Sequence, residues 1–178
     1  MKLWEGPNGE MPESGCCTAS DSEDARKVAS KLDIPYYVLD YTESFSKNVV
    51  DNFTQMYAQG LTPNPCVECN RSVKFDHFIN QAKKLNCDKV ATGHYAKIIK
   101  NNDKYELHKA DYLDKDQSYV LHMLKSSDLE NITFPLGEIS KPEVRQIAAR
   151  IGLKTAFKKD SQDICFVGKK DYRSFVEK

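Results

Sequence analysis

The chain has 178 residues, 40% hydrophobic and 29% charged, a balance that fits a soluble globular domain and excludes a disordered chain. Basic and acidic residues number 26 each, so the net charge indicates no nucleic-acid partner. Such a partner would need a local cluster of cations, for which the candidates are Lys83-Lys84, Lys158-Lys159 and Lys169-Lys170. No apolar run has the length of a membrane span and no secretory signal opens the chain, so we expect a cytoplasmic protein without a membrane partner, whose six cysteines stay reduced.

The first third of the chain predicts a helix, a strand and a second helix. Asp21 or Ser22 can cap the first helix, and Pro35 ends that segment. Residues 36–39 read as a short buried strand. The second helix stops at Gly60, and its apolar face consists of Phe45, Val49, Phe53, Met56 and Tyr57.

The rest of the chain alternates in the same way. A third helix is predicted after the Cys66–Cys69 turn, with an inward face made of Phe75, Phe78, Ile79, Ala82 and Leu85. The elements that follow are a strand over 89–92, a hairpin over 97–108 that turns at 101–103, a helix over 117–124, a capped helix from Ser140 to Gly152, and a strand over 164–167. This alternation predicts an α/β fold with a parallel sheet.

Two cysteines in the turn Cys66-Val67-Glu68-Cys69 are the first candidate site. Two prolines precede them and a helical pattern follows, so the exposed amides of a helix start would favour a thiolate. Cys69 is therefore a candidate nucleophile or persulfide carrier. The distant Cys165 lies just after a polar segment, residues 159–163.

A metal is the alternative use of these thiols. The second cysteine pair or the histidine pair that would complete a zinc site is absent from the sequence. An iron–sulfur cluster held by Cys66, Cys69 and Cys165 would leave one iron position open for sulfur, and this alternative stays open. Cys87 reads as a packing residue, and the adjacent Cys16-Cys17 pair favours a structural role.

Two further segments carry polar groups suited to ligands. Gly93-His94 follows a predicted strand end, where open parallel sheets bind nucleotides, although an ordinary turn would look the same. Residues 115–119 combine a cation, an amide, hydroxyls and an aromatic ring, which suits RNA contacts but also a polar helix start.

Together these segments resemble the tRNA-specific 2-thiouridylase family over nearly the whole chain. The motifs occur in the family's order and are Thr62-Pro63-Asn64-Pro65 through Cys69-Asn70, Lys74-Phe75, Ala91-Thr92-Gly93-His94-Tyr95, Lys115-Asp116-Gln117-Ser118-Tyr119, Phe134-Pro135-Leu136-Gly137, Lys141-Pro142-Glu143-Val144-Arg145 and Lys159-Asp160-Ser161 through Ile164-Cys165-Phe166. Met1-Lys2-Leu3-Trp4 resembles the end of a family strand. Several motifs in order are far more specific than any one of them.

The resemblance implies a parallel-sheet ATP-pyrophosphatase domain, similar to adenine nucleotide alpha hydrolases, that thiolates the wobble uridine of tRNA. ATP, with Mg²⁺, would adenylate the 2-oxygen of the uridine, a persulfide on Cys165 would deliver sulfur, and Cys69 would act as nucleophile or resolve the persulfide. By the same resemblance, the target base would contact Asn64, Pro65 and Cys66, the tRNA would contact Lys115, Asp116 and Gln117, and ATP would contact Met1 and Gly93. The implied partners are tRNA and a sulfur-donor protein, and we expect a monomer.

Two departures from the family pattern shape the expectations. The glycine-rich loop that cradles the ATP phosphates is missing, so we expect residues 1–168 to be a catalytic domain incomplete at its N-terminus and residues 169–178 to begin the next domain. Such a chain should bind ATP poorly and not turn over alone. Cys66 stands where many members carry aspartate, which removes a carboxylate role and favours the cluster alternative.

Two other functions remain as alternatives. One is an ATP-pyrophosphatase that amidates or ligates a small metabolite, in which the three placed cysteines would be idle. The other is a metal-binding or interaction module without catalysis.

Overall fold

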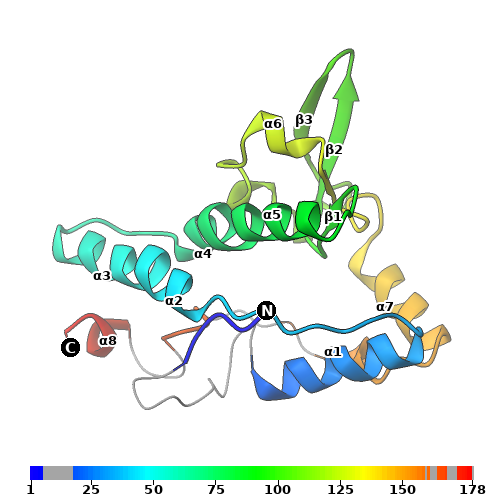
Figure 1. The fold of residues 1–178 in the computed structure, drawn as a ribbon, viewed down its shortest axis with the longest axis horizontal. Coiled ribbons are helices and arrows are strands. Elements are labelled where there is room, and N and C mark those ends of the chain that lie inside the picture. The colour runs from blue at the N-terminus through cyan, green and yellow to red at the C-terminus, as the bar shows by residue number, and fades with distance from the viewer. Residues whose placement is uncertain (6–17, 159, 161–163, 168–171, 178) are drawn as a thin grey trace. The chain divides into compact units, whose positions relative to one another are not determined.

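The computed structural model describes residues 1–5, 18–158, 160, 164–167 and 172–177. The chain forms two compact units, the first made of residues 1–65 and 158–178 and the second of residues 66–157 (Figure 1). Helices combined with a parallel strand pair confirm the α/β class. The expected domain boundary between residues 168 and 169 lies outside the described residues and stays a prediction.

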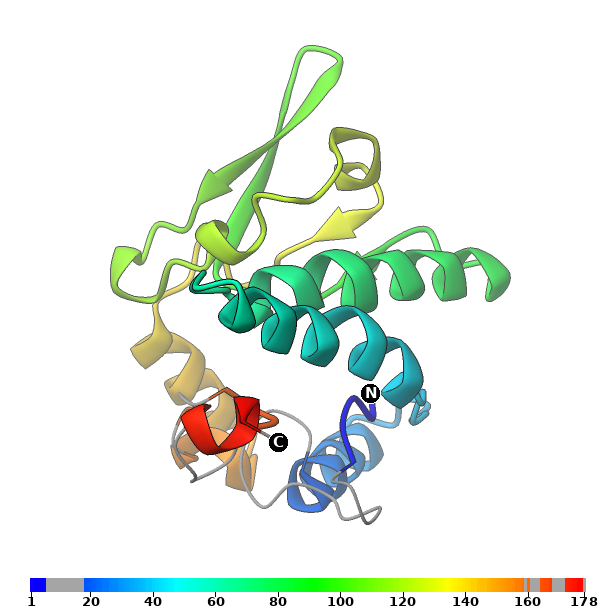
Figure 2. The ribbon, with the colours of Figure 1, turned by 90° about the vertical axis from the view of Figure 1, so that its left-hand side faces the viewer.

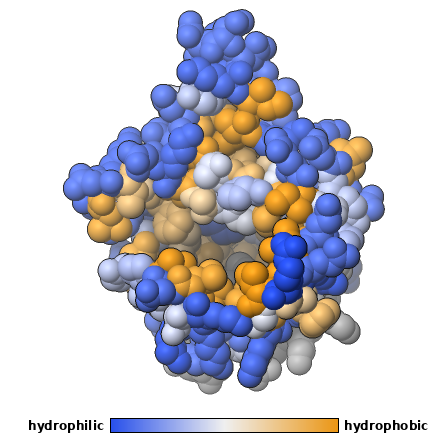
Figure 3. All heavy atoms as spheres, turned by 90° about the vertical axis from the view of Figure 1, so that its right-hand side faces the viewer, coloured by the Kyte–Doolittle hydropathy of each residue, from blue (hydrophilic) through white to orange (hydrophobic). Residues whose placement is uncertain are grey.

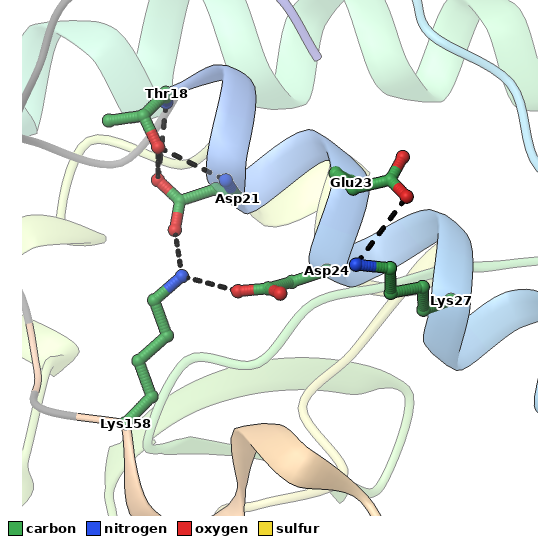
Figure 4. A network of polar contacts seen from close by, with 6 residues as sticks. All are labelled: Thr18, Asp21, Glu23, Asp24, Lys27 and Lys158. Atoms are coloured by element: carbon green, nitrogen blue, oxygen red, sulfur yellow. Dashed lines mark hydrogen bonds and ion pairs between the residues drawn. The ribbon is translucent and has the colours of Figure 1, made fainter.

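The first unit contains α1 (Ala19–Lys31), α2 (Thr42–Phe45), a π-helical segment η1 (Ser46–Val50), α3 (Asp51–Ala58) and α8 (Tyr172–Val176). Helix α1 begins with a capping box, in which the Thr18 hydroxyl accepts a hydrogen bond from the Asp21 amide at 3.0 Å and the Asp21 carboxylate accepts one from the Thr18 amide at 3.1 Å. Lys158 donates to Asp21 at 2.7 Å and to Asp24 at 2.6 Å, which joins the two chain segments of this unit (Figure 4).

Aromatic rings form the core of the first unit. Phe45 and Phe53 lie one above the other on the continuous helix over 42–58 and are 0% and 1% exposed. Phe166 contacts both, with ring centroids 5.7 and 5.1 Å away, and Trp4 packs against Phe45 and Phe166 at 6.4 and 6.1 Å. The apolar spacing therefore predicted this helix correctly, and Gly60 ends it with φ +76°.

The predicted strand over residues 36–39 is wrong. These residues are extended, but the described residues pair there only through a parallel bridge between Lys2 and Asp40. Tyr37 and Val38 are 75% and 53% exposed, so the apolar run is not buried as a central strand would be. Residues 164–167 are also not the predicted strand. They form a turn in which the Val167 amide donates to the Ile164 carbonyl at 3.2 Å.

One continuous helical run leads from Pro65, the last residue of the N-terminal segment of the first unit, into the second unit; it is made of α4 (Pro65–Glu68), a π-helical segment η2 (Cys69–Phe75) and α5 (Asp76–Lys84). Phe75 and Ile79 face the core as predicted, whereas Leu85 is 60% exposed and not buried. The helix starts at Pro65 and not after Cys69, because proline fits the first helical position, where no amide donor is needed.

The strands of this unit form two small sheets. Strands β1 (Val90–Ala91) and β4 (Ile132–Thr133) pair in parallel, and β2 (Ala96–Asn101) and β3 (Lys104–Lys109) form the predicted hairpin. Asn102 supports the hairpin turn with φ +53°, a conformation that asparagine tolerates better than most residues. In Figure 2 the green hairpin rises from the rest of this unit, with α6 (Ser126–Leu129) beside β3.

Short helices complete the second unit. The predicted helix over 117–124 is a 3₁₀ turn, η4 (Ser118–Val120), followed by further turns, and η3 (Leu113–Lys115) precedes it. The capping box of Ser140 and Glu143 opens α7 (Lys141–Arg150) as predicted, with Pro142 in the first turn and Gly152 after the end at φ +71°. A final 3₁₀ turn, η5 (Lys154–Phe157), follows.

Candidate functional site

The two thiols of the cysteine turn lie inside the first turns of the helix over 65–84. Cys66 belongs to α4 and is exposed, whereas Cys69 begins η2 and is only 6% exposed. Cys66 is therefore the more accessible of the two cysteines.

Asn70 links this helix to the segment over 115–120. Its side chain is 2% exposed, and its amide Nδ2 donates to the Val120 carbonyl at 3.2 Å across 50 residues of sequence. The other amide atom, Oδ1, is buried without a hydrogen-bond partner among the described residues. Burial of an acceptor without a partner lowers the stability of the folded protein. Segments of π-helix such as η2 also recur at functional sites.

The end of β1 carries Gly93 and His94. Gly93 is exposed, and a Cβ atom there would meet only Leu136 Cδ1 at 3.8 Å, so this backbone is open to approach by a ligand. His94 Nδ1 lies 2.8 Å from the Thr92 hydroxyl, and its ring packs against Phe75 and Phe134 at 6.0 Å. Burial, assisted by the positive charge of Lys74, lowers the pKa of His94 to about 4, so the imidazole is neutral near pH 7.

In the segment Lys115-Asp116-Gln117, the side-chain oxygens of Asp116 and Gln117 accept hydrogen bonds within the protein. Gln117 makes two hydrogen bonds with Tyr95, its backbone amide donating to the carbonyl at 2.8 Å and its Oε1 accepting from the amide at 3.1 Å. The two oxygens of Asp116 accept from the Ala110 amide at 2.8 Å and the Ser118 hydroxyl at 2.7 Å. These contacts position the loop next to the Gly93-His94-Tyr95 turn, and a role in tRNA contact for Lys115, Asp116 and Gln117 stays a prediction.

The first unit holds the remaining candidates. Cys165 is half-buried in the turn over 164–167, directly before Phe166, whose ring is anchored in the aromatic core. Met1 is 37% exposed and Asn64 is exposed, while Pro65 is buried at the start of α4. The anchoring of Phe166 therefore fixes the position of the Cys165 backbone within this unit.

The candidate residues are divided between the two units. Cys66, Cys69, Gly93 and the segment over 115–117 belong to the second unit, and Cys165 belongs to the first. The approach of Cys69 to Cys165 stays a prediction. Within residues 1–5, 18–158, 160, 164–167 and 172–177, no three Cys, His, Asp or Glu side chains gather to hold a metal ion. The described part of the chain also contains no helix long and apolar enough to cross a membrane.

Sequence reasoning missed two residues that shape the second unit. The signal for Asn70 was its place beside Cys69 in an otherwise apolar helix face, but only tertiary structure shows that its amide reaches Val120. Gly137 closes the turn after Phe134, and a Cβ there would overlap the carbonyl oxygen of Ala96. The motif Phe134-Pro135-Leu136-Gly137 is thus explained by close packing against β2.

The chain is similar to known proteins along its whole length. Residues 1–169 match the family described as tRNA methyl transferase HUP domain. The chain is 48% identical over 177 residues to the tRNA-specific 2-thiouridylase MnmA of Chloroflexus aurantiacus, which covers 99% of this chain and 49% of that protein. Proteins of the same description from Leptospira interrogans and Clostridioides difficile are 47% and 46% identical over 180 residues, which cover 100% of this chain and 48% and 50% of theirs. The chain thus spans about half the length of the curated relatives it matches.

Proposed function

Because the chain belongs to the tRNA methyl transferase HUP-domain family, we propose that it is the catalytic part of a tRNA-specific 2-thiouridylase. The observation that carries this proposal is the identity of 46–48% with relatives of that description over 99–100% of the chain. The substrate is then a tRNA wobble uridine, the cosubstrate is ATP with Mg²⁺, and a sulfur-donor protein supplies sulfur. We place this reaction in the cytoplasm, where thiols stay reduced, and expect the protein to act as a monomer.

The reaction we propose proceeds in three displacements. The 2-oxygen of the uridine attacks the α-phosphorus of ATP and releases pyrophosphate, which turns the oxygen into part of an AMP leaving group. The terminal sulfur of a persulfide on Cys165 then attacks C2, and AMP departs. Cys69 thiolate attacks the remaining Cys165 sulfur, breaks the sulfur–sulfur bond and leaves a disulfide between the two cysteines, which a dithiol reductant must open before the next turnover.

The other candidate residues serve this reaction in distinct ways. Gly93, open at the end of the parallel strand β1, suits close approach of ATP, together with Met1 of the first unit. Asn64, Pro65 and Cys66 border the target base, and the loop over Lys115, Asp116 and Gln117 contacts the tRNA. Cys66 is a thiol without a carboxylate, so we assign it no acid or base step. We route no step through an iron–sulfur cluster, which stays the alternative use of Cys66, Cys69 and Cys165.

The decisive experiment restores the parts that the chain does not span. In a chimera, residues 1–178 replace the matched half of the Chloroflexus aurantiacus relative, and 2-thiouridine is measured by mass spectrometry after incubation with ATP, tRNA transcript, cysteine and a cysteine desulfurase. We expect product from the chimera and a loss of at least about 100-fold in Cys69→Ser and Cys165→Ser. Cys87→Ser, which changes an exposed thiol of the second unit, is the matched control and should retain full activity.

Other outcomes point elsewhere. A folded chimera that makes no 2-thiouridine contradicts the proposed function, and full activity of both serine variants contradicts sulfur delivery by these cysteines. The 178-residue chain alone should bind ATP weakly and not thiolate tRNA, and turnover by the purified chain would contradict this expectation. Iron that copurifies anaerobically and is lost with Cys66→Ser would support the cluster alternative.

A further inference from the structure

A hollow of about 320 Å³ opens in the second unit between strand β2 and the end of strand β4. Three lysines border it, Lys89 before β1 and Lys97 and Lys100 on β2, and Glu138 is the one carboxylate that the described residues add to the lining. Thr133 and Tyr105 add hydroxyl groups to the lining. None of the candidate residues described above lines this hollow, which we call the lysine groove.

The three ammonium groups of the lysine groove differ in their partners. Lys97 forms an ion pair with Asp111, which neutralises part of its charge. Lys100 stands over the Tyr105 ring, with Nζ 5.4 Å from the centroid, and this contact leaves its hydrogen-bond donors available. Lys89 has no ion pair among the described residues. Two ammonium groups therefore face the groove without a neutralising carboxylate of their own.

Apolar side chains form the floor of the groove, and its rim is exposed to solvent. Ile132 and Phe134 line it and are 2% and 7% exposed, so protein atoms and not solvent lie behind them. Low polarity behind a charge strengthens its attraction for an opposite charge at the surface. Lys89, Lys100 and Glu138 are exposed at the rim, so the groove admits a ligand that continues beyond it.

The hairpin extends the groove with a hydrophilic surface. Each residue of its tip, 100–104, is exposed, and the tip includes a further lysine, Lys104. Figure 3 shows hydrophilic side chains covering the outermost part of this unit, where the hairpin turns. A small anion would use only the groove, whereas a polymer with repeated phosphates can contact the groove and the hairpin together.

We propose that the lysine groove binds the phosphodiester backbone of the tRNA substrate. This proposal rests on the proposed function for the identity of the RNA, but it adds a contact surface away from the cysteine turn. Lysine ammonium groups act as point charges, so they suit phosphates without reading base sequence. The groove positions the RNA, and discrimination among tRNAs lies elsewhere in the complex.

The test measures binding of an unmodified tRNA transcript to the purified 178-residue chain over a series of salt concentrations. We expect the double variant Lys89→Gln/Lys100→Gln to weaken binding about tenfold at low salt and to lower the slope of log K against log salt by about 1.4–1.8, or 0.7–0.9 for each lost phosphate contact. Glu138→Gln removes the one carboxylate and should strengthen binding severalfold. Lys97 is kept unchanged, because Asp111 already pairs with its charge.

The matched control is Arg150→Gln/Lys154→Gln, which removes two exposed cations at the end of α7 and in η5 of the same unit. Circular dichroism establishes that each variant is folded. The proposal is overturned if the chain binds no tRNA at low salt, or if the control weakens binding as much as the groove variant. A chimera that fails to thiolate tRNA, while groove variants still alter tRNA binding, contradicts the proposed function and leaves the groove intact.

Discussion

Aromatic rings fill the core of the first unit, whereas the second unit packs aliphatic side chains from α5 and two small sheets around Phe75 and Phe134. The first core joins Trp4, Phe45 and Phe166, which come from three distant stretches of the chain. The second unit is one continuous stretch, residues 66–157. Contacts between distant segments carry a larger entropy cost of loop closure. The position of Cys165 depends on a few such contacts between rings, whereas Cys66 and Cys69 are held by the helix of which they are part.

The largest effect should come from Phe166→Ala. The ring is 5% exposed and contacts Trp4, Phe45, Phe53 and Phe175 at centroid distances of 5.1–6.1 Å. Its removal leaves a cavity, and we expect the free energy of unfolding to fall by about 3–5 kcal/mol. Urea unfolding followed by the fluorescence of Trp4 measures it, because this single tryptophan lies in the affected core. Phe157→Ala, at a ring 79% exposed, should change the free energy by less than about 0.5 kcal/mol. Equal effects would show that the ring cluster does not hold this unit.

The corresponding weak point of the second unit is Gly137. Alanine there would force its Cβ against the Ala96 carbonyl of β2, and we expect a loss of about 3 kcal/mol, measured by urea unfolding followed by circular dichroism. Gly93→Ala is the control, because its nearest contact would be an ordinary 3.8 Å. That variant should be as stable as the unaltered chain. Destabilisation by both would mean that β1 and β2 tolerate no added side chain.

A smaller effect is expected in the second unit, where the free energy of unfolding should depend on pH through His94. The pKa of His94 in the folded chain, about 4, lies below its ordinary value of 6.5, so the unfolded chain binds the proton more tightly. The stability that the neutral ring contributes is complete above pH 6.5 and is lost as the pH falls toward 4. Between about pH 7.5 and about pH 5 we expect a loss of about 2 kcal/mol that is absent from His94→Asn. His122→Asn, at an exposed histidine, should keep the dependence of the unaltered chain. The same acid sensitivity in His94→Asn would assign it to other groups.

The smallest effects should come from the two capping boxes, one in each unit. Thr18→Ala and Ser140→Ala each remove a hydroxyl that accepts from a backbone amide, and each should cost about 1 kcal/mol. Lys158 holds the Asp21 side chain in the first unit. Burial alone would raise the pKa of Asp21, but hydrogen bonds from Lys158 and Thr18 outweigh it and lower that pKa. Hydrogen exchange at the first turn of each helix measures both effects. A much larger loss at Thr18 would show that the cap also stabilises the junction between the chain segments of this unit.

Residue patterns predicted one part of the candidate site and missed another. The motifs identified the family, the cysteine turn and the open glycine after β1, because these depend on the order and type of residues. They did not reveal that the side-chain oxygens of Asp116 and Gln117 accept hydrogen bonds from the backbone, or that the Asn70 side chain donates to the Val120 carbonyl. Those contacts join residues 6 to 50 positions apart, and spacing along one element carries no information about them.

By itself the sequence determined the helix over 42–58, the hairpin turn at Asn102 and the capped helix after Ser140, because apolar periodicity, turn residues and caps act within a few neighbouring positions. Only the tertiary structure decided that residues 36–39 are exposed, that residues 164–167 turn, and that Cys69 is buried while Cys66 is not. A strand needs a partner and a buried thiol needs neighbours, and both are supplied by distant parts of the chain.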